Sequence, residues 1–254
     1  KEAKGHDTSR SPGARGRKKQ TDREAATPAA ATSPAPAATS ADEAPAVEPV
    51  TQVKAGVTYR VEHDSMGDVN VPVNAYYGAQ TQRAVENFPV SGRKAHPAMI
   101  RAFVAVKRAC AMANESLGKL DQRRSRAICQ ACDEVLGRGL LLDQWVVDIY
   151  QAGAGTSMNM NTNEVLANRA LELMNKHRGQ YDVLSPNDHV NMSQSTNDTF
   201  PTAMHVAALL VWRDLRLALE QMVRDLSAKA RIFNTVIKSG RTHLQDAVPI
   251  RLGQ

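Results

Sequence analysis

The sequence predicts a mainly α-helical fold, in which a small N-terminal helical domain is followed by the start of a bundle of long helices. Hydrophobic residues make up 42% of the 254 residues but aromatic residues only 4%, so the core is built mainly from aliphatic side chains that suit packed helices. Apolar residues also recur at helical spacing from Pro201 to about Val236, with no glycine or further proline between them. One helix about 50 Å long is therefore expected there.

A helix of this length is not stable alone in water and needs several partner helices along its apolar side. The sequence predicts one such helix and no second one. Its partners are expected to come from other subunits or from sequence beyond Gln254, and the chain is interpreted as a fragment.

The chain divides into three parts by composition. Residues 1–57 are rich in Ala, Pro, Ser and Thr, with a basic block and too few apolar groups for a core, which predicts a disordered tail. Residues 58–190 are expected to form the N-terminal domain, with short extended segments over 58–73 and helices over 97–117, over 122–136 and from about 159. Residues 191–254 are expected to form the truncated start of the central helical bundle.

Charge and hydropathy exclude two classes of partner. The net charge is +6, but a dense block of the basic residues lies in the tail and the others are scattered among acids. No basic stripe is interleaved with aromatic residues, so nucleic-acid binding is not expected. No run of about 18 apolar residues occurs, so no membrane span is expected.

Three cysteines, an odd number, cannot form a full disulfide framework, which favours a cytoplasmic protein. The Arg, Ser and Ala content of the tail leaves an organellar transit peptide as an alternative. Cys129 and Cys132 form a single CxxC pair on a predicted amphipathic helix, and no second ligand pair has the spacing of a zinc site. The sequence therefore predicts no metal and no cofactor.

Three polar segments interrupt the apolar helices: 153–165 (GAGTSMNMNTNEV), 185–202 (SPNDHVNMSQSTNDTFPT) and 240–249 (GRTHLQDAVP). The structural interpretations are a capped turn, a helix cap and a structural histidine, respectively. One cap explains one side chain, however, and not four consecutive polar residues from Ser195 to Asp198. Neutral hydroxyls, an amide, backbone N–H groups and one histidine suit a small dicarboxylate better than a metal, a phosphate ester or a sugar.

In order and spacing these segments resemble the substrate-site segments of the fumarase/aspartase superfamily, and the likeness extends from about Tyr59 to Gln254. The resemblance implies a fumarase/aspartase-like fold and a homotetramer in which three subunits contribute to each active site. It also implies a lyase that adds or removes a small molecule across the double bond of fumarate or a fumaryl group. The reaction removes a proton beside a carboxylate, so several hydrogen-bond donors must stabilise the doubly negative aci form of that carboxylate.

The resemblance assigns six residues to the site: substrate-binding Thr156, Ser195, Thr196, Asn197 and Thr242, and catalytic His243. Thr156 is expected to donate to a substrate carboxylate, and Asn197 to lie near the departing group. His243 is expected to orient the substrate or to assist proton transfer. The family's general base is a serine on a Gly-Ser-Ser-type loop that nothing in these 254 residues matches, so the fragment is expected to be inactive alone.

Local differences favour the aspartase branch, which deaminates L-aspartate to fumarate and ammonia. The GAGTS opening resembles the aspartase form. Many bacterial fumarases carry a second dicarboxylate site with a His just before PND and an Arg a few residues earlier, where this sequence has Ser185 and about Asp182. HDSMGDVNVP and FPTAMHVAALL resemble fumarases instead. A fumarase that hydrates fumarate to L-malate and a catalytically inactive homologue are therefore the alternatives.

Overall fold

The computed structural model describes residues 51–54 and 56–254 of the chain. The predicted tail up to residue 50 lies outside the described residues. The sequence also placed Thr51–Lys54 in that tail, but in the structure they form strand β1 and pair with the next strand.

Three antiparallel strands in the order β1-β2-β3 form a small sheet: β1 (Thr51–Lys54), β2 (Val57–Asp64) and β3 (Gly67–Pro72). Val69 and Val71 alternate with more exposed residues along β3 and are buried against Ala79 at the start of helix α1 (Ala79–Asn87). These strands confirm the short extended segments expected over 58–73.

Three helices surround the main hydrophobic core: α2 (Pro97–Ser116), α3 (Gln122–Arg138) and α4 (Thr156–Leu173). Their starts follow from local chemistry, because His96 and Asp121 each accept a hydrogen bond from a first-turn amide of the helix that follows. Helix α4 buries 14 of its 18 residues, which places it at the centre of the core. The fold is mainly helical, as predicted.

Two short turns of helix lie beside these elements. A 3₁₀ turn, η1 (Leu142–Gln144), precedes α4, and a π-helical turn, η2 (Pro186–Val190), follows it. The side chain of Ser185 caps η2 by accepting a hydrogen bond from the amide of Asp188 at 3.1 Å.

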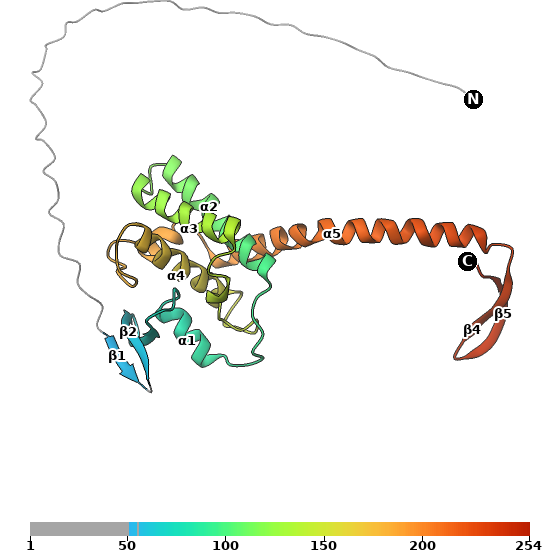
Figure 1. Cartoon of the computed structure of the whole chain (residues 1–254), viewed down its shortest axis with the longest axis horizontal. Coiled ribbons are helices and arrows are strands. Elements are labelled where there is room, and N and C mark those ends of the chain that lie inside the picture. Colours follow the sequence, from blue (N-terminus) through green and yellow to red (C-terminus); the bar gives the residue numbers. More distant parts are fainter. Residues whose placement is uncertain (1–50, 55) are drawn as a thin grey trace, which may run out of the picture. The chain divides into compact units, whose positions relative to one another are not determined.

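The long helix α5 (Thr196–Ile232) has 37 residues and is therefore about 55 Å long (Figure 1). The expected start at Pro201 is wrong by five residues. The amides of Asp198 and Thr199 already donate to the carbonyl of Ser195, so the helix begins before the proline. Pro201 lies inside it, and the carbonyl of Asn197 consequently receives no helical hydrogen bond from position 201.

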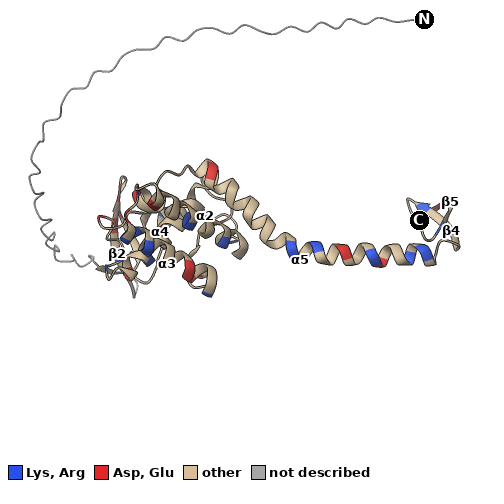
Figure 2. Ribbon diagram, turned by 90° about the horizontal axis from the view of Figure 1, so that it is seen from above, with Lys and Arg blue, Asp and Glu red and all other residues tan. Residues whose placement is uncertain are grey.

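From Ala208 onwards apolar side chains are exposed on every side of α5, whereas Phe200, Val206 and Ala207 pack against the core. Four consecutive residues, Leu209 to Trp212, are each between 46% and 68% exposed. No Lys, Arg, Asp or Glu occurs from Thr199 to Trp212. Apart from Asp198 in the first turn, the charged residues of α5 are gathered in its C-terminal part (Figure 2). Within the described residues, no helix combines the length and apolar character that crossing a membrane requires.

The segment after α5 was expected to be a loop, and this prediction is wrong. It forms a β-hairpin of β4 (Ile237–Thr242) and β5 (Gln245–Arg251). The two-residue turn places His243 and Leu244 at positive φ, 50° and 61°, which a type I′ hairpin turn requires. Type I′ turns favour Asn, Asp and Gly, and neither His243 nor Leu244 is one of these, so the sequence pattern did not predict the turn.

Candidate active site

The first polar segment forms a tight turn at the start of α4. Gly153 and Gly155 have φ of 60° and 86°, and Gly155 is the N-cap residue of the helix. A side chain at position 155 would overlap the ring of Phe200, so the turn requires glycine both for its backbone conformation and for this close approach. The turn and the start of α5 are therefore in direct contact.

Gln151 completes this turn from outside the helix. Its Oε1 accepts a hydrogen bond from the amide of Met158 at 2.6 Å, and its Nε2 donates to the carbonyl of Asp148 at 3.2 Å. The side chain of Thr156, at the first helical position, is exposed. A helix N-terminus with an exposed hydroxyl beside it can donate to a carboxylate.

The second polar segment surrounds the N-terminus of α5. Ser195 occupies the N-cap position, but its hydroxyl makes no capping hydrogen bond. Thr196 accepts a hydrogen bond at 2.9 Å from Nδ2 of Asn159, which lies one turn into α4. Asn197 is exposed. Capping alone therefore does not account for these side chains, as the sequence indicated.

A cleft of about 570 Å³ lies between the two segments. Gly153, Gly155 and Asn197 line it together with the aromatic side chains of Tyr150 and Phe200. The structure thus brings the first and second predicted segments to one cleft, although they are about 40 residues apart in the sequence.

The third segment is not brought to this cleft within one chain. Thr242 and His243 are exposed at the tip of the β4–β5 hairpin, which follows the C-terminal end of α5. The helix is about 55 Å long. Strand β4 has six residues and extends about 20 Å, so the hairpin cannot return His243 to the cleft at the other end.

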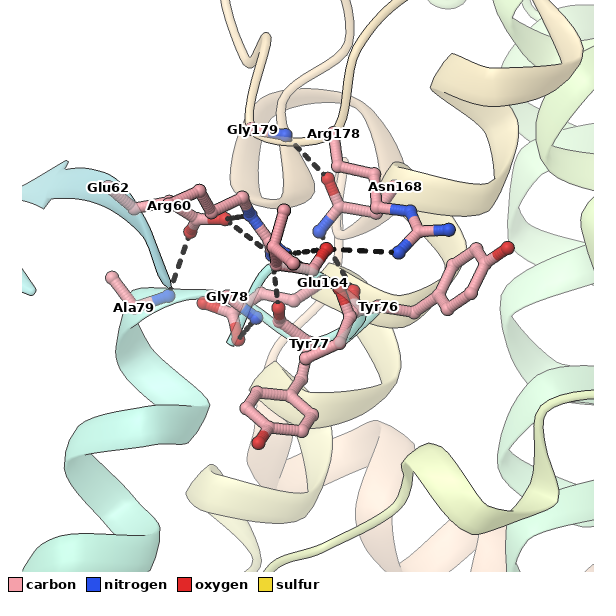
Figure 3. A network of polar contacts seen from close by, with 12 residues as sticks. Arg60, Glu62, Tyr76, Tyr77, Gly78, Ala79, Glu164, Asn168, Arg178 and Gly179 are labelled. Atoms are coloured by element: carbon pink, nitrogen blue, oxygen red, sulfur yellow. Dashed lines mark hydrogen bonds and ion pairs between the residues drawn. The ribbon is translucent and has the colours of Figure 1, made fainter. Parts of the chain in front are cut away.

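A polar network that the sequence did not predict joins α4 to the start of α1 (Figure 3). Glu164 accepts hydrogen bonds from the backbone amides of Gly78, Gln80 and Thr81 at 2.8 to 3.1 Å, and so caps α1 from another helix. Burial, together with the charge of Glu62, raises the pKa of Glu164 to about 7. This network fixes α1 to α4.

The sequence also missed the role of a buried lysine, Lys107, although its spacing placed this residue on the apolar side of the first predicted helix. Lys107 is fully buried in α2 and donates to Asn191 and Gln194, in the loop that precedes α5. A lysine at a core position of an amphipathic helix was the available signal.

Comparison with known proteins identifies the family. A family model described as lyase matches residues 67–254. The aspartate ammonia-lyase of Bacillus subtilis is 55% identical over 196 residues, which are 77% of this chain and 41% of that protein. This chain belongs to the fumarase/aspartase superfamily. A class II fumarate hydratase from Halobacterium salinarum is 53% identical over 197 residues, 77% of this chain and 42% of its own length.

Solved structures of the superfamily share the fold. A fumarate lyase:delta crystallin from Brucella melitensis is 52% identical, with a TM-score of 0.69 over 76% of this chain and 44% of that one. A class II fumarase from Schistosoma mansoni is 41% identical, with a TM-score of 0.65 over 77% and 41% of the two chains. The chain spans about two fifths of the length of the curated relatives it matches.

Proposed function

We propose that the chain is part of an aspartate ammonia-lyase, which converts L-aspartate reversibly to fumarate and ammonia. Ser185 carries this choice of substrate. Its hydroxyl caps η2 and its amide donates to Nδ1 of His189 at 2.8 Å, so this position offers no cation to a second dicarboxylate. Burial and the charge of Arg124 lower the pKa of His189, so the neighbouring imidazole is neutral near pH 7 as well.

The cleft supports the chemistry of a carbanion stabilised by a carboxylate. Of the predicted donors, Asn197 lines the cleft directly. Thr156 at the α4 N-terminus, Ser195 and Thr196 lie in the two segments that meet there. In this proposal these neutral donors bind one substrate carboxylate and stabilise the second negative charge that it acquires when the adjacent C–H proton leaves. Asn197 lies by the departing amino group.

The same proposal requires a homotetramer with shared active sites. An apolar helix surface such as that of α5 becomes stable when it is buried in a bundle. His243 and Thr242 of a second copy then supply the third segment to the cleft, since those of the same chain cannot reach it. A cytoplasmic location fits the three unpaired cysteines.

A fumarase is the second candidate, because class II fumarate hydratases are similar at nearly the same identity as the aspartate ammonia-lyases. The two substrates differ in the departing group, water or ammonia. The substrate preference must therefore be measured with C-terminal parts taken from both kinds of enzyme, so that the added part does not determine the outcome.

Two chimeras separate the candidates. In one, residues 59–254 of this chain replace the corresponding segment of the Bacillus subtilis aspartate ammonia-lyase (the aspartase chimera). In the other, they replace that of the Bacillus subtilis class II fumarate hydratase, which is 49% identical. Fumarate absorbance is followed with L-aspartate and with L-malate, and the two parent enzymes are the controls. We expect L-aspartate turnover in both chimeras. If both chimeras turn over L-malate alone, the chain is part of a fumarase. If each chimera has the substrate of the enzyme that supplied its C-terminal part, the argument from Ser185 is refuted.

A further inference from the structure

Lys107 makes an unusual pair of contacts for a buried cation. Its Nζ donates at 2.8 Å to Oδ1 of Asn191 and at 2.8 Å to Oε1 of Gln194, and both acceptors are neutral amide oxygens. Burial lowers its pKa to about 7. Burying an amine is unfavourable, and a methionine of similar length would fill the same space without that penalty. Core packing alone therefore does not explain a lysine here.

The contacts of Lys107 determine how the loop before α5 is folded. Because an ammonium group can only donate, both amide oxygens face Nζ and both NH₂ groups turn back to the loop. Nε2 of Gln194 donates to the carbonyl of Val190 at 2.9 Å, and Nδ2 of Asn191 to that of Gln194 at 3.4 Å. This closed arrangement holds Ser193 at a positive φ of 59°, two residues before the N-cap of α5.

The network continues from this loop into both segments that line the cleft. Oδ1 of Asn191 also accepts from Nδ2 of Asn159 at 3.3 Å, and the same Nδ2 donates to the hydroxyl of Thr196 at 2.9 Å. Asn159 lies one turn after Thr156 on α4. Since the hydroxyl of Thr196 is the acceptor in this contact, its own proton is left to donate to a ligand.

An apolar path runs parallel to this polar one. Nζ of Lys107 lies 5.7 Å from the centre of the Phe103 ring, and that ring lies 6.0 Å from the ring of Phe200. Phe200 in turn packs against Gly155 in the first segment. Both paths begin at Lys107 and end in the two segments that form the cleft.

We propose that Lys107 is a positioning residue that holds the Ser195–Asn197 segment in register with the Gly153–Thr156 turn. The inference rests on the proposed function for its effect on turnover, but not for its effect on the local structure. The same two segments supply the donors, and a displacement of about 1 Å in such a site lowers turnover on the order of 100-fold.

The first test measures amide hydrogen exchange in the 254-residue chain with the substitution Lys107→Met. We expect the amides of Asp198 and Thr199, which form the first turn of α5, to exchange at least about tenfold faster, while the amides of α3 are unchanged. Arg108→Met is the matched control, because Arg108 is the next residue of α2 and its side chain forms a surface ion pair with Asp133. The control is expected to change neither region.

The second test measures turnover of the aspartase chimera with the same substitutions. Lys107→Met is expected to lower kcat about 100-fold with less than about threefold change in KM, and Arg108→Met to leave both unchanged. Gln194→Met is the second variant, because Gln194 is partly exposed and its substitution is expected to leave the fold intact. We expect about tenfold lower kcat for it.

Three outcomes would overturn the inference. They are unchanged exchange at Asp198 and Thr199 in both Lys107→Met and Gln194→Met, an equal rise of exchange in α3, and normal kcat in both variants of an active chimera. If the unsubstituted chimera turns over neither L-aspartate nor L-malate, the proposed function fails, and the exchange rates alone decide the role of Lys107.

Discussion

Helices α4 and α5 differ in burial in a way that their compositions do not predict. Helix α4 carries many Asn and Thr residues, yet 14 of its 18 residues are buried, whereas α5 is rich in Leu and Val and buries two of 37, Thr199 and Ala203. Several polar side chains of α4 have partners elsewhere in the same chain; the hydroxyl of Thr162, for example, accepts from Nε1 of Trp145 at 2.9 Å. Among the described residues, Oδ1 of Asn159 and of Asn163 accepts no hydrogen bond. The comparison teaches that burial depends on the available partners: the N-terminal part of α5 packs on α2 and α4, and the rest of the helix contacts no other described helix.

The largest expected effect comes from a charge on α5. In the aspartase chimera, Leu210→Arg should abolish assembly and lower turnover at least about 1000-fold, because an unpaired guanidinium would be buried in the bundle. Light scattering after size exclusion measures the mass, and fumarate absorbance the turnover. Met66→Arg is the control, since Met66 is a comparably exposed apolar residue, 71% exposed, away from the helix. A Leu210→Arg protein that keeps its assembly would show that α5 has no partner helices.

The next effect tests whether the two separated parts of the site act on one substrate. Thr156→Val and His243→Asn in the aspartase chimera should each lower kcat about 10²–10³-fold, roughly 3 to 4 kcal/mol of transition-state stabilisation. Asn tolerates the positive φ of position 243, so the hairpin turn is retained. Kinetics and thermal unfolding are measured together, with exposed His63→Asn as the control. Near-normal turnover with a lower Tm would mean that both residues are structural.

A smaller difference is expected in the stability of the 254-residue chain. Leu166→Ala, in the fully buried face of α4, should lower the free energy of unfolding by about 2–5 kcal/mol. Leu210→Ala on α5 should change it by less than about 0.5 kcal/mol. Urea unfolding is followed by fluorescence in a Trp212→Phe background, so that buried Trp145 is the reporter. Equal losses in the two variants would contradict the contrast between the two helices.

The last effect is a pH dependence within the packed part. The folded-state pKa of Glu164 is about 7, above its unfolded value of 4.5, so the folded chain binds more protons between these values. Its contribution to stability is complete below about pH 4.5 and is lost as the pH rises to 7, at no more than about 1.4 kcal/mol per pH unit.

Glu164→Gln should remove this slope, measured by urea unfolding from pH 4.5 to 7.5. Glu134→Gln is the control, because hydrogen bonding to Arg169 lowers the pKa of Glu134 and gives the opposite sign, with stability lost as the pH falls. A slope that persists unchanged in Glu164→Gln would place the titrating group elsewhere.

Much of the fold could be predicted from periodicity and caps. The helix starts at Pro97 and Gln122 agree with the structure, because proline and the aspartate cap before Gln122 act locally. The contact between the first two polar segments follows from the family resemblance. The roles assigned to their side chains are still predictions.

The parts that could not be predicted depend on partners distant in sequence or on unusual backbone conformations. Periodicity placed Lys107 on a buried face but could not identify the two amide oxygens 84 and 87 residues later that hold its protons. The hairpin was missed because His243 and Leu244 adopt a turn that sequence signals associate with Asn and Gly. Pro201 suggested a helix start, but the amides of Asp198 and Thr199 already donate to the carbonyl of Ser195, so the helix begins before the proline.

The cap that Glu164 supplies to α1 also has a consequence for the order of events during synthesis. Helix α1 has nine residues, no side-chain cap of its own and no acidic residue in its first turn, and a helix that short is not stable alone. Its N-terminal amides are held by a carboxylate 86 residues later than Gly78. At typical rates of translation those residues take on the order of 4 to 20 s to emerge. The earliest part of the domain to be made is therefore completed among the last, when α4 arrives to close it.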